Sequence, residues 1–268
     1  MQAMTLQKTS FWVLVAIILA FLTLPALVVI MTSFNPTEIL RFPPQGFSLR
    51  WYARAFTYSD FQNAFYSGLI VTVVASTIAS VVGVAAAYII DRYQFTGRRL
   101  LEFILVSPLI VPRFTTGFGF LLIGAQIGLA GSYPLVILTH IVLVLPFVMR
   151  SVYVSLANID PALERAAANL GASPINVLMR ITVPLLTPGI VGGWIVASIL
   201  SFTEFTASLY VTNYSTQTLP VAMYTYVREY TDPTIAAISA LLIVSTTVGM
   251  FVVDRFLGLK RILAIETH

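Results

Sequence analysis

The sequence predicts an all-α integral membrane protein with six transmembrane helices. Only 10% of its 268 residues are charged, whereas a soluble domain has about 25%. The residues are 58% hydrophobic and the mean hydropathy is +0.90. Charged residues are bunched, and the uncharged segments between them are long enough to cross a bilayer about 30 Å thick, which takes roughly 20 helical residues. Barrel strands of about 9 to 11 alternating residues are far shorter, so helices are the expected spanning elements.

The six spans form one membrane domain over residues 1–268. The apolar region from 101 to 155 holds two of them, because residues 128–134 form a Gly/Pro turn signal. The first span is expected to be retained, since its apolar run exceeds the roughly 7 to 15 residues of a signal peptide and no small-x-small cleavage site follows. The spans are expected at about residues 11–34, 64–90, 101–127, 133–155, 189–212 and 234–256, with a cytoplasmic loop at 156–188.

Lysine and arginine set the expected orientation. With the N-terminus in the cytoplasm, ten basic residues lie in inside segments and four in outside segments, which satisfies the positive-inside rule. Both termini are therefore expected in the cytoplasm, and topology alone explains the pI of 9.4 without a nucleic-acid partner. The inside residues are Lys8, Arg92, Arg98, Arg99, Arg150, Arg165, Arg180, Arg255, Lys260 and Arg261; the outside residues are Arg41, Arg50, Arg54 and Arg228.

The cytoplasmic loop begins with the pattern of a short helix. Asp160 can cap a helix that has Pro161 at its first position. Residues 162–170 are rich in strong helix formers, and Gly171 is placed to end the helix. A second short helix is expected after a tight turn.

Ser173 and Pro174 repeat the same start for that second helix. Pro184, Pro188 and Gly189 are then expected to break the chain before the fifth span.

The first loop helix carries few bulky side chains, of which Leu163 and Leu170 are apolar. A small-residue helix ended by glycine can enter a narrow cleft and approach another backbone closely. The alternative is an interfacial helix that covers the underside of the bundle.

This loop resembles the EAA loop of ABC-importer permeases. In that pattern E-A-A is followed after three residues by G, and after nine more by I-x-L-P. Every spacing matches, although Arg165 replaces the first glutamate, with Glu164 directly before it, and Val183 replaces leucine. The coupling-loop residues that the resemblance implies are Glu164, Arg165, Ala166, Ala167, Leu170, Gly171, Ile181 and Pro184.

The resemblance extends over nearly the whole chain. The stretches "FPPQGFSLRWYARAF", "AAAYIIDRYQFTGRR" and "LTHIVLVLPFVMRSVYVSLANIDPALERAA" are similar to the spermidine/putrescine permease-like subgroup. That subgroup resembles the membrane subunits of polyamine, ferric-ion, aminoalkylphosphonate and opine importers. The resemblance implies the type I ABC-importer permease fold in the inner (plasma) membrane of a bacterium.

The resemblance also implies partners. The EAA loop would dock on a cytoplasmic ABC ATPase dimer, a second homologous permease would complete the pathway, and an extracytoplasmic substrate-binding protein would deliver the solute. ATP and Mg²⁺ would bind to the ATPase, because the sequence has no G-x-x-x-x-G-K-[ST] phosphate loop. No catalytic, cofactor or metal site is expected in this chain, which has no cysteine and no HExxH motif.

Ionisable side chains within the spans are candidates for the translocation pathway, because charge is costly in a bilayer. Glu204 lies in the fifth span with Thr203 beside it, and in the family this span lines the pathway. Arg113 follows Pro112, which can open the third helix locally; it could meet an anionic ligand or pair with Glu204. His140 lies in the fourth span. The structural alternatives are a carboxylate satisfied by Ser or Thr, an arginine pair, and a histidine hydrogen-bonded between helices.

The outer segments 35–62 and 213–232 are polar and rich in aromatic residues. Such composition is typical of interfacial anchoring. Together the two segments would form the surface on which a binding protein docks, and Arg228, Glu229 and Asp232 could make ion pairs with it.

The substrate stays open at this stage, because one buried acid suggests a cation and one buried base suggests an anion. Polyamine, aminoalkylphosphonate, opine-like compound and ferric ion are the candidates. The alternative function is an ATP-independent secondary transporter or channel subunit, which has no use for a coupling loop and often shows inverted repeats, of which this sequence has none. An intramembrane enzyme would need converging catalytic side chains, for which Glu204, Arg113 and His140 are too sparse.

Overall fold

The computed structural model describes residues 2–39 and 41–257, with side chains at 9–39, 41–249 and 251. The expected cytoplasmic C-terminus, with Lys260 and Arg261, lies outside the described residues, and so do the side chains of Lys8 and Arg255. Within the described residues every regular element is a helix, which confirms the all-α prediction. In chain order the helices are α1 (Gln2–Thr32), α2 (Arg50–Thr57), α3 (Ser59–Arg92), α4 (Arg98–Val106), the 3₁₀ turn η1 (Ser107–Leu109), α5 (Arg113–Gln126), α6 (Tyr133–Ala157), α7 (Pro161–Asn169), α8 (Pro174–Val177), the π turn η2 (Leu178–Thr182), α9 (Val183–Phe202), α10 (Ser208–Val211), α11 (Leu219–Glu229) and α12 (Thr234–Leu257).

The chain divides into two compact units. Among the described residues, unit 1 comprises those up to Gln62 together with Met223–Val248, and unit 2 comprises Asn63–Ala222 and those from Gly249. The helices α3, α11 and α12 each begin in one unit and end in the other.

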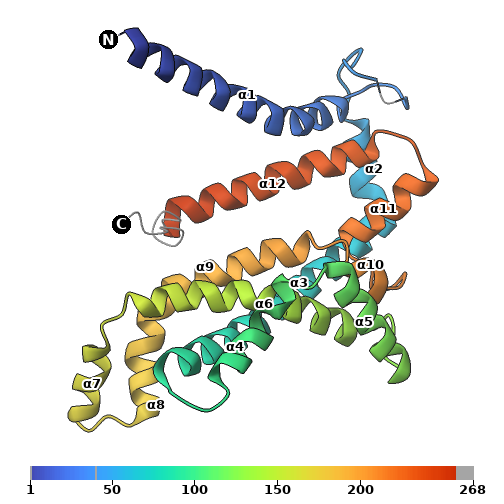
Figure 1. The fold of residues 1–268 in the computed structure, drawn as a ribbon. Coiled ribbons are helices and arrows are strands. Elements are labelled where there is room, and N and C mark those ends of the chain that lie inside the picture. The colour runs from blue at the N-terminus through green and yellow to red at the C-terminus, as the bar shows by residue number, and fades with distance from the viewer. Residues whose placement is uncertain (1, 40, 258–268) are drawn as a thin grey trace. The chain divides into compact units, whose positions relative to one another are not determined.

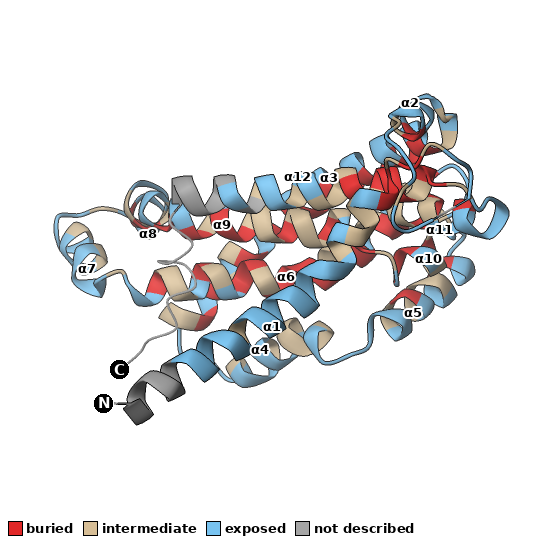
Figure 2. Cartoon of the chain, turned by 90° about the horizontal axis from the view of Figure 1, so that it is seen from above, coloured by how far each residue is buried: buried red, intermediate tan, exposed pale blue. Residues whose placement is uncertain are grey.

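Unit 2 is built around α6 and α9, which lie side by side along most of their length (Figure 1). Buried residues recur along the length of both helices (Figure 2). The core is made of small and branched apolar side chains, which let helices approach closely in a membrane protein. Its fully buried members include Ala79, Ala87, Val148, Val152, Leu156, Leu186 and Ala197.

Two glycines set the distance between α6 and α9. A Cβ atom on Gly189 would lie 2.7 Å from the Cβ of Ser155, and one on Gly193 would lie 3.2 Å from the Cα of Val148. The hydroxyl of Ser151 donates to the carbonyl of Gly189 at 2.8 Å. The glycines are four residues apart, so both lie on one face of α9. They form a small-xxx-small contact of the kind that packs membrane helices.

The third expected span, 101–127, is not one helix. α4 with η1 and α5 meet at an angle of 104°, with the break between Leu109 and Arg113. Pro112 has φ −56° and ψ 135°, outside the helical region, and stands directly before α5. Proline restricts the residue before it to extended backbone and can start a helix without losing a needed N–H donor. The local opening expected at Pro112 is therefore a sharp bend.

The fifth span also differs from the prediction at both ends. A helix runs without interruption from Pro174 to Phe202, so Pro184, Pro188 and Gly189 do not break the chain. The N–H of Val183 bonds to the carbonyl of Leu178, five residues back, in the wider π turn η2. We infer that this wider turn accommodates the proline ring that follows it, since a proline in a regular α-helix would clash with the carbonyl four residues back. The helix ends at Phe202, ten residues before the predicted end at 212.

In unit 1 the end of α1 is anchored to the following segment. The indole Nε1 of Trp51 donates to the carbonyl of Asn35 at 2.7 Å, and the hydroxyls of Ser33 and Tyr52 lie 2.6 Å apart. Trp51 is buried, at 2% exposure. Trp51 and Tyr52 of α2 therefore hold in place the residues that directly follow α1. These two aromatic residues have a role in packing in addition to the expected anchoring at the membrane interface.

The six-span count stays a prediction. By length and composition four described helices could cross a membrane, or five if the bent pair counts as one span. The described apolar part of α12, Thr234–Gly249, is shorter than the others. The four helices are Thr9–Thr32, Ser59–Arg92, Tyr133–Ala157 and Pro174–Phe202.

The α6–α9 contact predicts that Gly189→Ala destabilises the protein by about 1–3 kcal/mol, because the added methyl group overpacks a tight interface. We expect a lower midpoint of thermal unfolding in detergent. Gly119→Ala is the matched control, since a Cβ at Gly119 in α5 meets nothing within 4 Å. Equal midpoints for the two variants would contradict the proposed packing constraint.

Candidate functional site

The loop between α6 and α9 has the predicted local structure at its first helix. The backbone N–H of Ala162 donates to the Asp160 carboxylate at 2.8 Å, so Asp160 is the N-cap of α7. Gly171 has φ +87°, the left-handed conformation that glycine adopts without strain. Both ends of α7 thus follow from local chemistry, as the sequence indicated.

Glu164 connects α7 to two other elements. Arg92 Nε, at the end of α3, donates to Glu164 Oε2 at 3.0 Å, and Thr182 Oγ1, in η2, donates to Oε1 at 2.8 Å. The side chains of Arg92 and Glu164 are 17% and 13% exposed. Arg92 also pairs with the neighbouring Asp91. A charge-assisted contact between partly buried groups favours one geometry, so these contacts hold α7 to the end of α3 and to η2, which directly precedes α9.

The sequence did not identify Arg92 or Thr182 as partners of Glu164. The one available signal was that Arg92 is the first basic residue after the second span, next to a loop that carries an acid. The resemblance aligned Arg165, and not Glu164, with the glutamate of the motif. Arg165 is exposed and Glu164 makes the ion pair.

The loop also presents apolar side chains to its surroundings. We call these four residues the apolar loop set: Leu163, Leu170, Ile175 and Met179. Leu170, beside the turn at Gly171, is 90% exposed. Exposed apolar side chains gathered on one loop indicate a protein or membrane contact. Of the remaining predicted loop residues, Ala166 and Pro184 are exposed, and Ala167 and Ile181 are partly buried.

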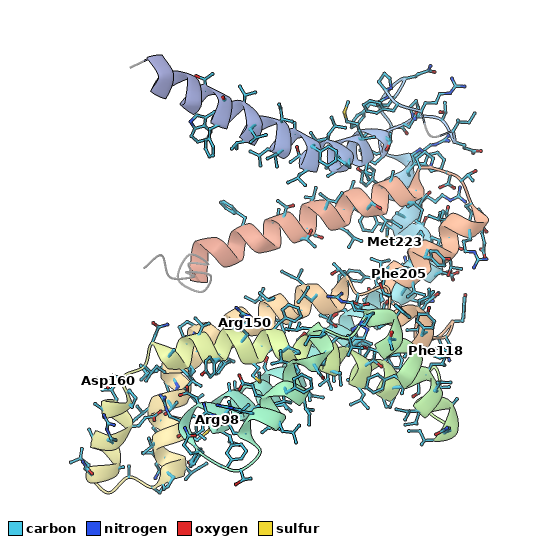
Figure 3. All side chains as sticks on the ribbon, viewed as in Figure 1. Arg98, Phe118, Arg150, Asp160, Phe205 and Met223 are labelled. Atoms are coloured by element: carbon cyan, nitrogen blue, oxygen red, sulfur yellow. The ribbon has the colours of Figure 1, made fainter. Side chains whose placement is uncertain are left out.

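At the opposite end of unit 2 the chain leaves helical structure between α9 and α10. In Figure 3 the label Asp160 shows the end of unit 2 that carries the loop, and the label Phe205 shows the end that carries this break. Glu204 lies within the break and is 2% exposed. Its Oε1 accepts from the backbone N–H of Ala207 at 2.9 Å, and its Oε2 pairs with Nη1 of Arg113, the first residue of α5.

His140 in α6 holds both sides of this break. Its Nδ1 lies 2.8 Å from the hydroxyl of Ser201, and its Nε2 lies 2.9 Å from the hydroxyl of Ser208. The Ser208 hydroxyl donates to the carbonyl of Glu204 at 2.9 Å, so it accepts from the Nε2–H group of His140. In the neutral imidazole, Nδ1 then accepts from Ser201.

The structure therefore brings Arg113 and Glu204 into contact and joins His140 to the same break through Ser208. Thr203 is exposed, and its hydroxyl donates to the carbonyl of Ile199 at 2.8 Å, one turn back in α9. Among the described residues no three His, Cys, Asp or Glu side chains gather to hold a metal ion.

Of the charged residues predicted for the binding-protein surface, Asp232 is already paired within the chain. Asp232 accepts from Arg54 at 3.2 Å, from the hydroxyl of Tyr226 at 2.9 Å, and from the backbone N–H of Thr234 at 2.9 Å. Burial alone would raise the pKa of Asp232, but the Thr234 and Tyr226 hydrogen bonds and Arg54 together lower it below 3.8. The prediction that Asp232 is available for an external partner is therefore wrong for this side chain, because its carboxylate is already occupied.

Arg228 and Glu229 are exposed at the end of α11, and the Arg228 guanidinium lies 5.8 Å from the ring centre of Tyr224. These two side chains remain accessible for an external partner.

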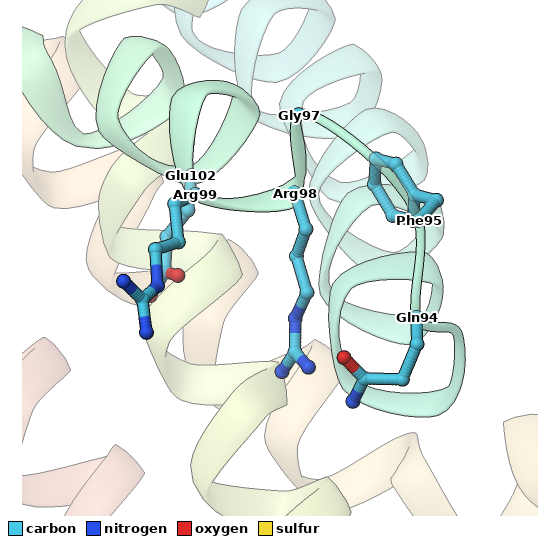
Figure 4. Close-up of a pocket in the computed structure, with 6 residues that line it drawn as sticks. All are labelled: Gln94, Phe95, Gly97, Arg98, Arg99 and Glu102. Atoms are coloured by element: carbon cyan, nitrogen blue, oxygen red, sulfur yellow. The ribbon is translucent and has the colours of Figure 1, made fainter.

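A hollow of about 530 Å³ lies at the connection from α3 to α4. Figure 4 shows the side chains of Gln94, Arg98 and Arg99 extending in the same direction from this connection. No residue predicted for a functional site lines it. The lining residues are Gln94, Phe95, Gly97, Arg98, Arg99 and Glu102.

The family model described as "Binding-protein-dependent transport system inner membrane component" matches residues 79–259. The chain is 31% identical over 235 residues to the spermidine/putrescine transport system permease protein PotC of Escherichia coli (strain K12), covering 86% of this chain and 87% of that protein. It is 29% identical over 241 residues to the putrescine transport system permease protein PotI of the same strain, covering 87% and 85%.

Among solved structures, the chain is similar to a chain of a bacterial ABC transporter involved in the import of the acidic polysaccharide alginate. The TM-score is 0.74, with 16% identity over 96% of this chain and 98% of that chain. At this level of identity the likeness shows a shared fold.

The Glu164 network predicts that Glu164→Gln loosens the loop. Replacing a charged hydrogen-bond partner of Arg92 should lower the local opening free energy by about 1–3 kcal/mol. We expect faster amide hydrogen exchange over residues 161–182 in detergent. Arg165→Gln is the matched control, because Arg165 is an exposed neighbour on the same helix. Unchanged exchange in Glu164→Gln would show that the ion pair does not hold the loop.

The lowered pKa of Asp232 predicts a specific pH dependence in unit 1. A carboxylate with a folded-state pKa below its unfolded value of 3.8 stabilises the fold above that pH, and the contribution is lost as pH falls through the lowered pKa. Asp232→Asn should therefore lower the midpoint of thermal unfolding at pH 7, and the difference from wild type should shrink only below pH 3.8. A difference that disappears by about pH 5 would contradict this assignment.

Proposed function

The chain belongs to the binding-protein-dependent transport system inner membrane component family, and we propose that its loop around Gly171 couples a separate ATPase to solute movement. As a member of that family it is a membrane permease subunit of an ABC importer. The observation that carries the coupling proposal is the Glu164 network, which connects α7 to α3 and to η2, directly before α9.

The apolar loop set is the surface that would dock on a cytoplasmic ABC ATPase dimer. Its exposed apolar side chains would be more stable in a groove on a protein than in contact with water. ATP and Mg²⁺ would bind to the ATPase. When the ATPase dimer closes, α7 moves with it, and the Arg92–Glu164–Thr182 contacts pass that movement to the spanning helices.

The other proposed partners follow from the surface of the chain. No residue is buried in the most apolar 18-residue window of α1, so lipid or a second homologous permease would cover it. An extracytoplasmic substrate-binding protein would dock on the outer segments, where Arg228 and Glu229 are accessible. We propose that the chain is a multi-pass protein of the inner membrane of a bacterium, with both termini in the cytoplasm.

The proposed solute is a small nitrogen-containing compound. The relatives PotC and PotI carry names that assign them to spermidine and putrescine transport, and aminoalkylphosphonates, opine-like compounds and ferric ion are the other candidates. Glu204, Thr203, Arg113 and His140 are the candidate residues of the translocation pathway. A secondary transporter is the alternative function, and it would have no use for the Glu164 network.

The class of the protein is tested by purifying the chain from its native membrane in mild detergent and identifying the proteins that accompany it. We expect an ABC ATPase and a second permease, with ATP-dependent solute uptake after reconstitution with the binding protein. Recovery of the folded chain alone, with uptake that does not need ATP, would favour the secondary transporter.

The coupling role predicts that Gly171→Asp reduces uptake by at least about tenfold while the importer still hydrolyses ATP. A residue with a side chain at φ +87° costs about 1–2 kcal/mol, and the new carboxylate lies beside Leu170 in the apolar loop set. Gly128→Asp is the matched control, since Gly128 has φ +72°, also has nothing within 4 Å of a Cβ, and lies in the turn between α5 and α6. Wild-type uptake in a well-assembled Gly171→Asp importer would count against the coupling role.

A further inference from the structure

The two side chains of the Arg113–Glu204 pair differ strongly in solvent exposure. The Glu204 side chain is 3% exposed, whereas the Arg113 side chain is 44% exposed. Both carboxylate oxygens of Glu204 are occupied, Oε1 by the N–H of Ala207 and Oε2 by Arg113. The acid is therefore a buried counterion, and the accessible member of the pair is the cation.

The guanidinium of Arg113 keeps most of its hydrogen-bonding capacity. It has five N–H donors, and among the described residues its one side-chain partner is Glu204. Unsatisfied donors and an exposed charge are costly against lipid. These donors must therefore face water, a ligand or another protein chain.

The position of Arg113 is held by packing as well as by charge. A Cβ on Gly117, one turn further along α5, would lie 2.7 Å from both the Cα and the carbonyl oxygen of Ala207. α5 therefore lies directly on the α9–α10 break, which His140 bridges from α6 through Ser208. Such fixed geometry suits recognition, because little ordering is needed when a ligand binds.

We propose that Arg113 recognises an anionic group on the transported solute, and that the solute therefore carries a carboxylate or a phosphonate. An arginine pairs with these planar or multi-oxygen anions through two parallel hydrogen bonds. Arg113 is the first residue of the fourteen-residue helix α5, and the positive end of the helix dipole adds to the attraction. A solute with ammonium groups alone would meet the guanidinium first and could not reach the buried Glu204.

This inference rests on the proposed function and narrows its substrate class. Aminoalkylphosphonates and opine-like compounds carry both an amine and an anionic group, so they fit the site. Polyamines and ferric ion carry positive charge alone and do not.

The test uses the complete importer with its own binding protein in proteoliposomes, supplied with an equimolar mixture of putrescine, spermidine, 2-aminoethylphosphonate, octopine and the proteinogenic amino acids. Solutes accumulated with ATP are identified by mass spectrometry. We expect every accumulated solute to carry a carboxylate or a phosphonate. Accumulation of putrescine or spermidine would overturn the inference while leaving the proposed function intact. If no solute accumulated with ATP, the proposed function would be overturned, and with it the inference that the solute carries an anionic group.

A variant series then assigns the effect to Arg113. The double variant Arg113→Gln/Glu204→Gln removes both charges and leaves no unpaired buried carboxylate. We expect its uptake rate at low solute concentration to fall by about ten- to a hundredfold, as for the loss of a charge-assisted hydrogen bond. Arg113→Lys keeps the charge but not the fork of donors, and should lie between the double variant and wild type.

Arg150→Gln is the control for removal of an exposed arginine elsewhere on unit 2 and should change uptake little. Wild-type uptake by the assembled double variant would overturn the inference. Loss of the second permease from the purified double variant would also overturn it, because Arg113 would then be an interface residue.

Discussion

The requirement that polar groups inside a membrane protein be satisfied by the protein itself controls the fold of unit 2. The chain leaves helical structure between α9 and α10, which frees backbone carbonyl and N–H groups. Ser208 donates to the carbonyl of Glu204, and the Glu204 carboxylate accepts from the N–H of Ala207. His140 supplies the hydrogen bonds that hold the two serines on either side. The break is thus closed by side chains, and the same side chains place Glu204 against Arg113.

The helix α9 links this break to the loop at the other end of unit 2. Its 20 residues span about 30 Å at 1.5 Å per residue. Thr182 precedes it and bonds to Glu164, and Ser201 lies near its far end and bonds to His140. The contacts of Gly189 and Gly193 hold α9 against α6 between these points. In the proposed coupling mechanism, a displacement of the loop would reach the candidate recognition site through one continuous helix.

The two ion pairs of unit 2 serve different ends because their burial differs. Arg92 and Glu164 are both mostly covered, so the pair favours one arrangement of three elements. Arg113 and Glu204 are unequally covered, so the buried acid neutralises and orients an accessible base. The same two residue types thus form the proposed mechanical connection in one place and the proposed recognition group in the other.

The sequence by itself determined the all-α membrane class, the cap at Asp160, the turn at Gly171 and a local opening at Pro112, because each depends on composition or on a few neighbouring residues. That the opening is a 104° bend between two helices came from the structure. Only the tertiary structure decided that Pro184 and Pro188 lie inside a continuous helix, since a π turn and packing on α6 outweigh the local rule. Glu164 pairs with Arg92, which is 72 positions away in the sequence, and Glu204 pairs with Arg113, which is 91 positions away. The possible pairing of Arg113 with Glu204 was readable from the sequence, but which of the two would be exposed was not. Exposure depends on how distant helices pack around a side chain, and that is a property of the folded chain that no local pattern encodes.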